Sequence, residues 1–150
     1  MNLYLDNCCF NRPFDDQTQL RIRLETEAKL FIQARILEGK YKLVWSYILD
    51  FENDQNPFEL RKEIIRKWRE IAYIDIDAND EVIYLAEKIA VMGIKPKDAL
   101  HIACAVVADC KYFITTDNKI LNKGIKGIKD IKLIDPIGFI KLEEDNYNDD

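Results

Sequence analysis

Apolar residues along the chain fall either into short continuous runs or into longer stretches where they recur every three or four positions. Short runs rich in Val, Ile, Leu, Tyr and Phe are typical of buried strands, whereas the wider spacing is typical of helices that pack on a core. The short runs predict strands at 2–5, 43–45, 112–115 and 131–134. They also predict a shorter strand or an extended linker at 73–76.

Helices are predicted between these strands. The first has apolar residues at helical spacing in a charged background, and Gly39 ends it. These apolar residues are Leu20, Leu24, Leu30, Phe31, Ala34 and Leu37. Ser46 can cap a second helix, and Pro57 opens a third that reaches Trp68. Further helices are expected at about 80–92, at 98–108 after Pro96, around 120–121 and at 136–142.

Alternating strands and helices predict an α/β fold. Helices that connect successive strands produce a mostly parallel sheet covered on both faces, so we expect an α/β/α sandwich. The 150 residues suit one domain, which we place at residues 1–142. Residues 143–150 are polar and acidic, and we expect them to form a disordered tail.

Composition and charge exclude little. The net charge of −5 argues against a basic nucleic-acid-binding surface, but five of the acids lie in residues 143–150, and the remaining body carries 22 acidic and 22 basic residues. No secretory signal or membrane-spanning run is evident, and no membrane association is expected. The four cysteines match no zinc pattern, so we expect reduced thiols in a cytoplasmic protein.

Two acids follow predicted strands directly. Asp6 comes after the first strand, and Asp117 comes just after the strand at 112–115. Sites in open α/β sheets form beyond the carboxyl ends of the strands, which is where both carboxylates would lie. Either residue alone could equally be an ordinary turn or capping residue.

Two further acids lie on predicted helices. Glu52 shares the apolar stripe of Ile48 and Leu49, so it faces inward, where a carboxylate needs a cation or a metal ion. Asp98 lies in the first turn of an otherwise apolar helix. An ion pair could explain Glu52, and the helix dipole could explain Asp98. Four converging carboxylates, however, would repel one another, and Mg²⁺ or Mn²⁺ would offset that repulsion.

Taken together, these segments resemble the PIN-domain family. The opening strand with its acid, Leu3-Tyr4-Leu5-Asp6-Asn7, is similar to the family's first strand and first metal-binding Asp. The helix motif is Asp98-Ala99-Leu100-His101-Ile102-Ala103, and the closing strand is Tyr112-Phe113-Ile114-Thr115-Thr116-Asp117. The run from Val44 to Glu52 fits the strand and helix that carry the family's Glu.

The resemblance implies a metal-dependent endoribonuclease. Asp6, Glu52, Asp98 and Asp117 would match the family's metal-binding acids, and Thr115 would match the hydroxyl that supports them. The implied chemistry is hydrolysis of RNA phosphodiesters with Mg²⁺ or Mn²⁺, which leaves a 5′-phosphate and a 3′-hydroxyl. Many members are VapC-type toxins of bacterial toxin–antitoxin pairs, so a small antitoxin protein is an implied partner.

An alternative interpretation is a catalytically silent PIN-fold module that uses its acidic cleft to hold a metal or a protein partner. The long first helix and the turn at 11–16 differ from compact toxins. Arg12 could contact phosphate or pair with Asp15 or Asp16. His101 lies one helical turn after Asp98 and could be a solvated or core-edge side chain or have a catalytic role. A lysine series could form a solvated face or follow phosphates, and it consists of Lys119, Lys123, Lys126, Lys129 and Lys132. A homodimer is the default expectation.

Overall fold

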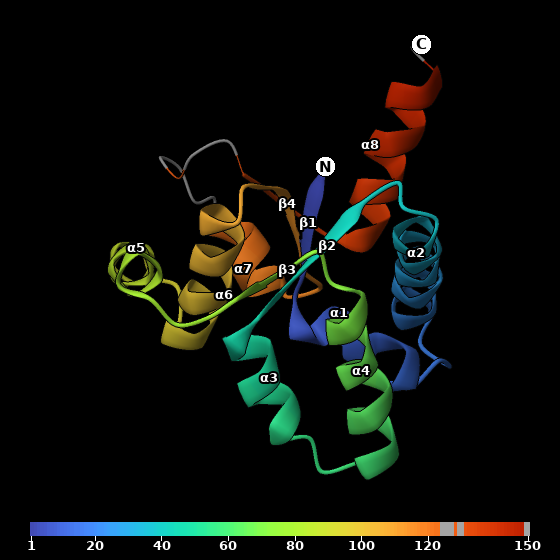
Figure 1. The fold of residues 1–150 in the computed structure, drawn as a ribbon. Helices are drawn as coiled ribbons and strands as arrows, with labels where there is room; N and C mark the ends of the chain where they lie inside the picture. The colour runs from blue at the N-terminus through green and yellow to red at the C-terminus, as the bar shows by residue number, and fades with distance from the viewer. Residues whose placement is uncertain (124–127, 129–130, 149–150) are drawn as a thin grey trace.

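A parallel five-stranded sheet forms the centre of the described structure (Figure 1). The computed structural model describes residues 1–123, 128 and 131–148. Its strands, in the order β3-β2-β1-β4-β5, pair parallel throughout. They are β1 (Asn2–Leu5), β2 (Lys42–Ser46), β3 (Ile74–Ile76), β4 (Cys110–Ile114) and β5 (Lys132–Ile134). All the predicted strands are therefore confirmed, and the open choice at 73–76 resolves to a strand.

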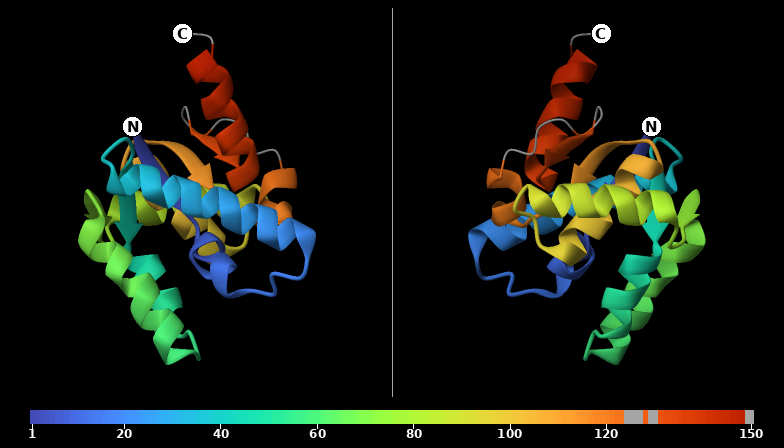
Figure 2. Two further views of the ribbon diagram at one scale, coloured as in Figure 1. Left: turned by 90° about the vertical axis from the view of Figure 1, so that its right-hand side faces the viewer. Right: turned by 90° about the vertical axis from the view of Figure 1, so that its left-hand side faces the viewer.

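Helices cover both faces of the sheet, which confirms the predicted α/β/α sandwich. One face carries α5 (Asp80–Val91) and α6 (Pro96–Val107), and the other carries α2 (Leu20–Leu37) and α8 (Pro136–Asn148), as the views in Figures 1 and 2 show. Helix α6 has six buried residues and packs on β4 and β2. Gly93 follows α5 with φ +96°, a conformation that favours glycine, and it ends that helix as predicted.

The remaining helices lie beyond the carboxyl ends of the strands. Helix α1 (Asn7–Asn11) and a 3₁₀ turn (Arg12–Phe14) follow β1, and α7 (Asn118–Asn122) follows β4. Helix α3 (Tyr47–Asp54) follows β2 and leads to α4 (Glu59–Ile71), and the pair extends away from the sheet (Figure 2). Ser46 caps α3 as predicted, since its hydroxyl accepts the Leu49 N–H at 3.3 Å. Helix α4 starts at Glu59, two residues later than predicted.

The buried face of α2 differs from the one that the apolar spacing suggested. The residues that define that spacing, among them Leu20, Leu24 and Phe31, are exposed, and Leu37 is 61% exposed. The face that packs inward contains Glu25, Thr26, Ala28, Lys29, Ile32 and Ile36. Periodicity therefore predicted the helix correctly but not its orientation, because the buried polar side chains of this face have partners in α1 and the 3₁₀ turn.

Helix α8 extends past the predicted boundary at Leu142. It continues to Asn148, and Tyr41 donates a hydrogen bond of 2.8 Å to Glu143, which ties its acidic part to the body. Residues 143–148 are thus helical where a disordered tail was expected, and Asp149 and Asp150 lie outside the described residues. The placement of the domain boundary stays a prediction.

Cys8, Cys9, Cys104 and Cys110 are all free thiols, as expected, and Cys104 is buried. Trp45 and Trp68 are buried core residues, also as expected. Within the described part of the chain, no helix has the length and apolar character needed to cross a membrane.

Candidate functional site

Asp6 occupies the junction between β1 and α1 and is 6% exposed. Its backbone N–H donates to Ile114 O at 2.9 Å, which extends the pairing of β1 with β4 by one residue. One carboxylate oxygen accepts the Asn7 N–H at 2.8 Å and so caps α1, and the other accepts the Thr115 hydroxyl at 2.8 Å. Strands β1 and β4 flank the point where the strand order reverses, the usual position of a binding crevice in such sheets.

Thr115 connects Asp6 to the second strand-end acid. The Thr115 hydroxyl donates to Asp6 and accepts the Asp117 N–H at 3.1 Å. Asp117 is half-buried, and one of its oxygens accepts the Lys119 N–H at 2.9 Å and caps α7. The fully buried threonine therefore fixes the position of the Asp117 backbone relative to the Asp6 side chain.

Glu52 reaches the same region from helix α3. One carboxylate oxygen accepts a hydrogen bond from His101 Nε2, and the other accepts one from Asn7 Nδ2 at 3.2 Å. The same His101 nitrogen lies 3.9 Å from Asp6 Oδ1. Burial of Glu52 raises its pKa, but the hydrogen bond and charge of His101, the charge of Lys97 and the Asn7 hydrogen bond together lower it below the usual value. Glu52 is therefore ionised and lies close to Asp6, with His101 between the two carboxylates.

Asp98 projects from the first turn of α6 and has a perturbed carboxyl group. Burial and the negative charges of Asp6 and Asp117 raise its pKa to about 6, and Glu52 adds to this effect. The positive charge of His101 acts in the opposite direction. The three other predicted acids thus all lie close enough to Asp98 to make its ionisation less favourable.

The donor set suits a hard divalent cation, but the carboxylates are not arranged around one point. Among the described residues, no three His, Cys, Asp or Glu side chains stand close enough together to hold a metal ion. Asp6, Glu52 and Asp117 instead direct oxygens at protein donors. All-oxygen carboxylate ligands are those that Mg²⁺ and Mn²⁺ prefer. Burial is the main cause of the raised pKa of Asp98, and the negative charges of Asp6 and Asp117 contribute a part that such an ion would offset.

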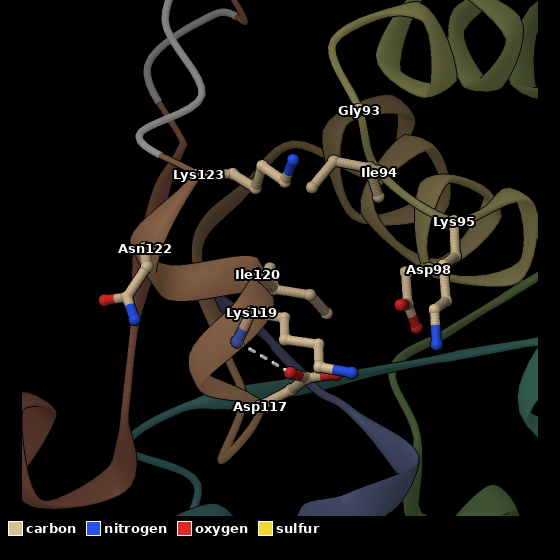
Figure 3. Close-up of a pocket in the computed structure, with 9 residues that line it drawn as sticks. All are labelled: Gly93, Ile94, Lys95, Asp98, Asp117, Lys119, Ile120, Asn122 and Lys123. Atoms are coloured by element: carbon tan, nitrogen blue, oxygen red, sulfur yellow. Dashed lines mark hydrogen bonds between the residues drawn. The ribbon is translucent and has the colours of Figure 1, made fainter.

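A pocket of about 560 Å³ opens beside Asp98 and Asp117 (Figure 3). The two acids lie at its lower end, and the side chains of Lys95, Lys119 and Lys123 extend into its surroundings. A second hollow of about 440 Å³ shares Asp117 and Lys119 with the first and adds Arg12 and Arg21. Basic side chains therefore line both sides of the strand-end acids.

Two of the five lysines in the series predicted from the sequence line the pocket. Lys119 and Lys123 line the pocket, and Lys132 is exposed on β5. Lys126 and Lys129 lie outside the described residues.

Some site residues were not recognised from the sequence. His101 and Asn7 both hold Glu52, and Cys8 Sγ lies 3.4 Å from Thr115 Oγ1 and 3.5 Å from Asp6 Oδ2. The spacing of His101, one helical turn after Asp98, was the available signal, since residues three apart share a helix face. Arg12 pairs with Asp15 at 3.0 Å, one of its two expected roles, and also with the buried Glu25 at 3.2 Å.

Comparisons with known proteins match the fold but not the sequence. No protein-family model matches the chain, and no curated protein matches it. A chain of the VapBC2 structure from Rickettsia felis, bound to a DNA fragment from its promoter, has a TM-score of 0.55 and 12% identity. The match covers 90% of this chain and 98% of that one.

A chain of the VapBC-1 structure from nontypeable Haemophilus influenzae has a TM-score of 0.58 and 18% identity, with 91% of this chain and 98% of that chain covered. At this level of identity the likeness concerns the fold. It confirms the PIN-like fold that the sequence resemblance implied.

The charge on Asp98 predicts an unusual stability effect. The native state holds the Asp98 proton up to pH about 6, whereas the unfolded chain releases it near 3.8, so ionised Asp98 destabilises the metal-free protein fully above pH 6. Asp98→Asn should raise the free energy of unfolding at pH 7 in EDTA by about 1–2 kcal/mol, which corresponds to roughly 2–8 °C in Tm. The gain should disappear towards pH 4, and thermal denaturation at both pH values measures it.

Asp80→Asn is the matched control, because Asp80 is an exposed acid in the first turn of α5. It should leave stability unchanged or slightly lower, since it removes a favourable dipole interaction. An Asp98→Asn protein that is no more stable than the native chain at pH 7 would contradict the charge repulsion between these carboxylates.

Proposed function

We propose that the protein is a metal-dependent endoribonuclease that hydrolyses RNA phosphodiesters. The observation that carries the proposal is the grouping of Asp6, Asp98 and Asp117 beside a pocket with basic walls. Carboxylates and lysines together match the two needs of phosphodiester hydrolysis, which are a site for a divalent cation and contacts for the phosphate backbone. The PIN-like fold and the position of the site at the strand-order switch agree with it.

Asp6, Asp98 and Asp117 would hold Mg²⁺ or Mn²⁺, and Glu52 would complete the ligand set. When bound, the ion lowers the pKa of a water molecule and polarises the phosphate. Thr115 keeps Asp6 in place through its hydroxyl. One of the acids would also accept the proton of the attacking water. Hydrolysis would form a bond from the water oxygen to phosphorus and break the bond from phosphorus to O3′, with a proton passing to O3′, so the products would be a 5′-phosphate and a 3′-hydroxyl.

The basic side chains around the acids would hold the RNA. Lys95 and Lys123 line the pocket on one side of Asp117, and Arg12 and Arg21 line the hollow on the other. Lys119 belongs to both. A strand that crosses the acids would place one phosphate at Asp117 and neighbouring phosphates on each basic side, which favours cleavage within a chain over trimming of its end.

We also propose that the chain is the toxin of a toxin–antitoxin pair, with a small antitoxin protein as its partner. The support is the likeness to chains of two VapBC structures and the exposed apolar side chains on α2, which include Leu20, Leu24 and Phe31. Contiguous apolar side chains on a helix surface are typical of partner contacts. The proposal requires a neighbouring gene that encodes a short protein. That protein should co-purify with this chain and block its RNase activity.

The competing function is that of a silent binding module with the same fold. It is favoured by the carboxylates' hydrogen bonds to protein donors and by the absence of a preformed three-residue metal group in the described chain. A silent module would bind Mn²⁺ or a protein partner without cleaving RNA, so activity separates the two.

Substitution of the acids should abolish cleavage without unfolding the protein. Asp6→Asn, Asp98→Asn and Asp117→Asn should each lower the rate of single-stranded RNA cleavage in Mn²⁺ by about 100-fold or more, because each removes a charge from the proposed cation site. Asp54→Asn, an exposed acid on the same helix as Glu52, should leave the rate unchanged. Labelled RNAs of varied sequence measure the cleavage rate, and circular dichroism shows whether each variant is folded. Equal rates for native and Asp117→Asn protein would contradict the proposal.

The lysines should act on binding rather than on chemistry. Combined Lys119→Ala and Lys123→Ala should weaken the affinity for a non-cleaved RNA and reduce the slope of log K against log salt by about 1–2. Lys111→Ala is the control, because Lys111 is exposed near the opposite end of β4. Fluorescence anisotropy with the Asp98→Asn background, at several salt concentrations, measures the effect. An unchanged salt slope would show that the pocket does not hold RNA.

A further inference from the structure

His101 lies in the middle of a buried chain of hydrogen bonds that ends on Glu52. Its Nδ1 is 2.6 Å from the Tyr4 hydroxyl, which is 2.6 Å from the Ser46 hydroxyl. Ser46 in turn accepts the Leu49 N–H at 3.3 Å. Tyr4, Ser46 and His101 each have an exposed fraction of 0%. The chain connects β1, the end of β2 and α6 to the carboxylate of Glu52 on α3.

The carboxylate of Glu52 fixes the direction of its hydrogen bond with His101. An ionised carboxylate only accepts, so Nε2 of His101 carries the proton that Glu52 receives. Burial raises the pKa of Tyr4 well above its usual value, so the phenol keeps its proton. Burial lowers the pKa of His101, but the hydrogen bond to Glu52 and the charges of Asp6 and Glu52 together raise it above its usual value. When the ring is neutral, one arrangement satisfies every group: Ser46 donates to Tyr4, Tyr4 donates to His101 Nδ1, and Nε2–H donates to Glu52. When the ring is charged, Nε2–H still donates to Glu52.

This arrangement gives Glu52 a defined position. A glutamate side chain has several rotatable bonds, and that of Glu52 is 21% exposed, so solvent would otherwise compete for it. His101 holds one oxygen and Asn7 holds the other. The same Nε2–H lies 3.9 Å from Asp6 Oδ1, so its positive end also reduces the repulsion between two carboxylates.

We propose that His101, held by Tyr4 and Ser46, is a positioning residue that fixes Glu52 beside Asp6 so that both acids can serve one divalent cation. The inference rests on the proposed function, which supplies the cation. Removal of a residue that hydrogen-bonds to a metal ligand and orients it commonly lowers metal affinity by about 10–100-fold. A histidine that serves only the core would instead change the stability of the fold and leave the affinity unchanged.

Four variants separate these roles. His101→Leu removes the donor, and His101→Gln returns an amide N–H near the position of Nε2. Tyr4→Phe removes only the hydroxyl and keeps the ring that stacks on Phe113 at 5.4 Å. Tyr112→Phe is the matched control, since Tyr112 is also buried on a central strand but packs on Phe139 away from the site.

The test is Mn²⁺ binding by calorimetry, with the Tm of the metal-free protein and the kcat and KM for RNA measured alongside. His101→Leu should weaken Mn²⁺ binding by about 10-fold or more. Tyr4→Phe should weaken it by about 3–10-fold, and His101→Gln should recover part of the loss. In the impaired variants kcat should fall while KM stays within about twofold, because the phosphate contacts are intact. Tyr112→Phe should match the native protein.

Mn²⁺ affinity within about twofold of native in both His101→Leu and Tyr4→Phe would overturn the inference, as would an equal loss in Tyr112→Phe. Nitrogen NMR gives a readout on the native protein without metal, because His101 is the single histidine of the chain. It should show Nε2 protonated, and an unprotonated Nε2 would also overturn the inference. A native protein that binds no Mn²⁺ yet shows the expected nitrogen signals would instead contradict the proposed function.

Discussion

The arrangement of the acids depends on the hydrogen bond between the Thr115 hydroxyl and the Asp6 carboxylate. It joins the ends of β1 and β4, the two strands between which the strand order reverses. The Asp6 backbone pairs with Ile114 and its other oxygen caps α1, so the most buried acid of the site is held from three directions. The other acids then take their positions relative to it: Asp117 through Thr115, and Glu52 through His101.

Bringing these acids close together lowers the stability of the metal-free fold. This loss of stability is visible at Asp98, because burial and the charges of Asp6 and Asp117 raise its pKa to about 6. Stability alone would favour a neutral side chain there, so the carboxylate points to a task that needs the charge. Polar and basic neighbours partly compensate, since His101 and Asn7 donate to Glu52, and Lys95 and Lys119 line the adjacent pocket.

The sequence predicted the strands well, because a short apolar run is typical of a buried strand. It did not predict which face of α2 is buried, since the buried face contains Glu25 and Lys29 and the exposed one contains Leu20 and Phe31. Spacing indicates that a helix is amphipathic, but it does not show that Glu25 can be buried, because its partner Arg12 lies in the neighbouring 3₁₀ turn. The inward face also contains Ile32 and Ile36.

The candidate acids were found because each interrupts an apolar pattern, at a strand end or on an inward helix face. The role of His101 could not be found in that way. Its ring is placed by contacts to Tyr4 and Glu52, which are 97 and 49 positions away, and a single polar residue on an apolar helix is compatible with many roles until those partners are known. The same holds for Asn7, whose amide meets Glu52 only after β1 and α3 are brought together.

The central claim is that the strand-end acids form a site for one divalent cation, and a crystal structure with Mn²⁺ tests it most directly. The account predicts an anomalous-scattering peak coordinated by Asp6 together with Asp98 and Asp117, with the Asp117 carboxylate turned away from the Lys119 N–H that it accepts in the present structure. Crystals in millimolar Mn²⁺ that show no peak there, and in which all the carboxylates keep their hydrogen bonds to protein donors, would contradict it.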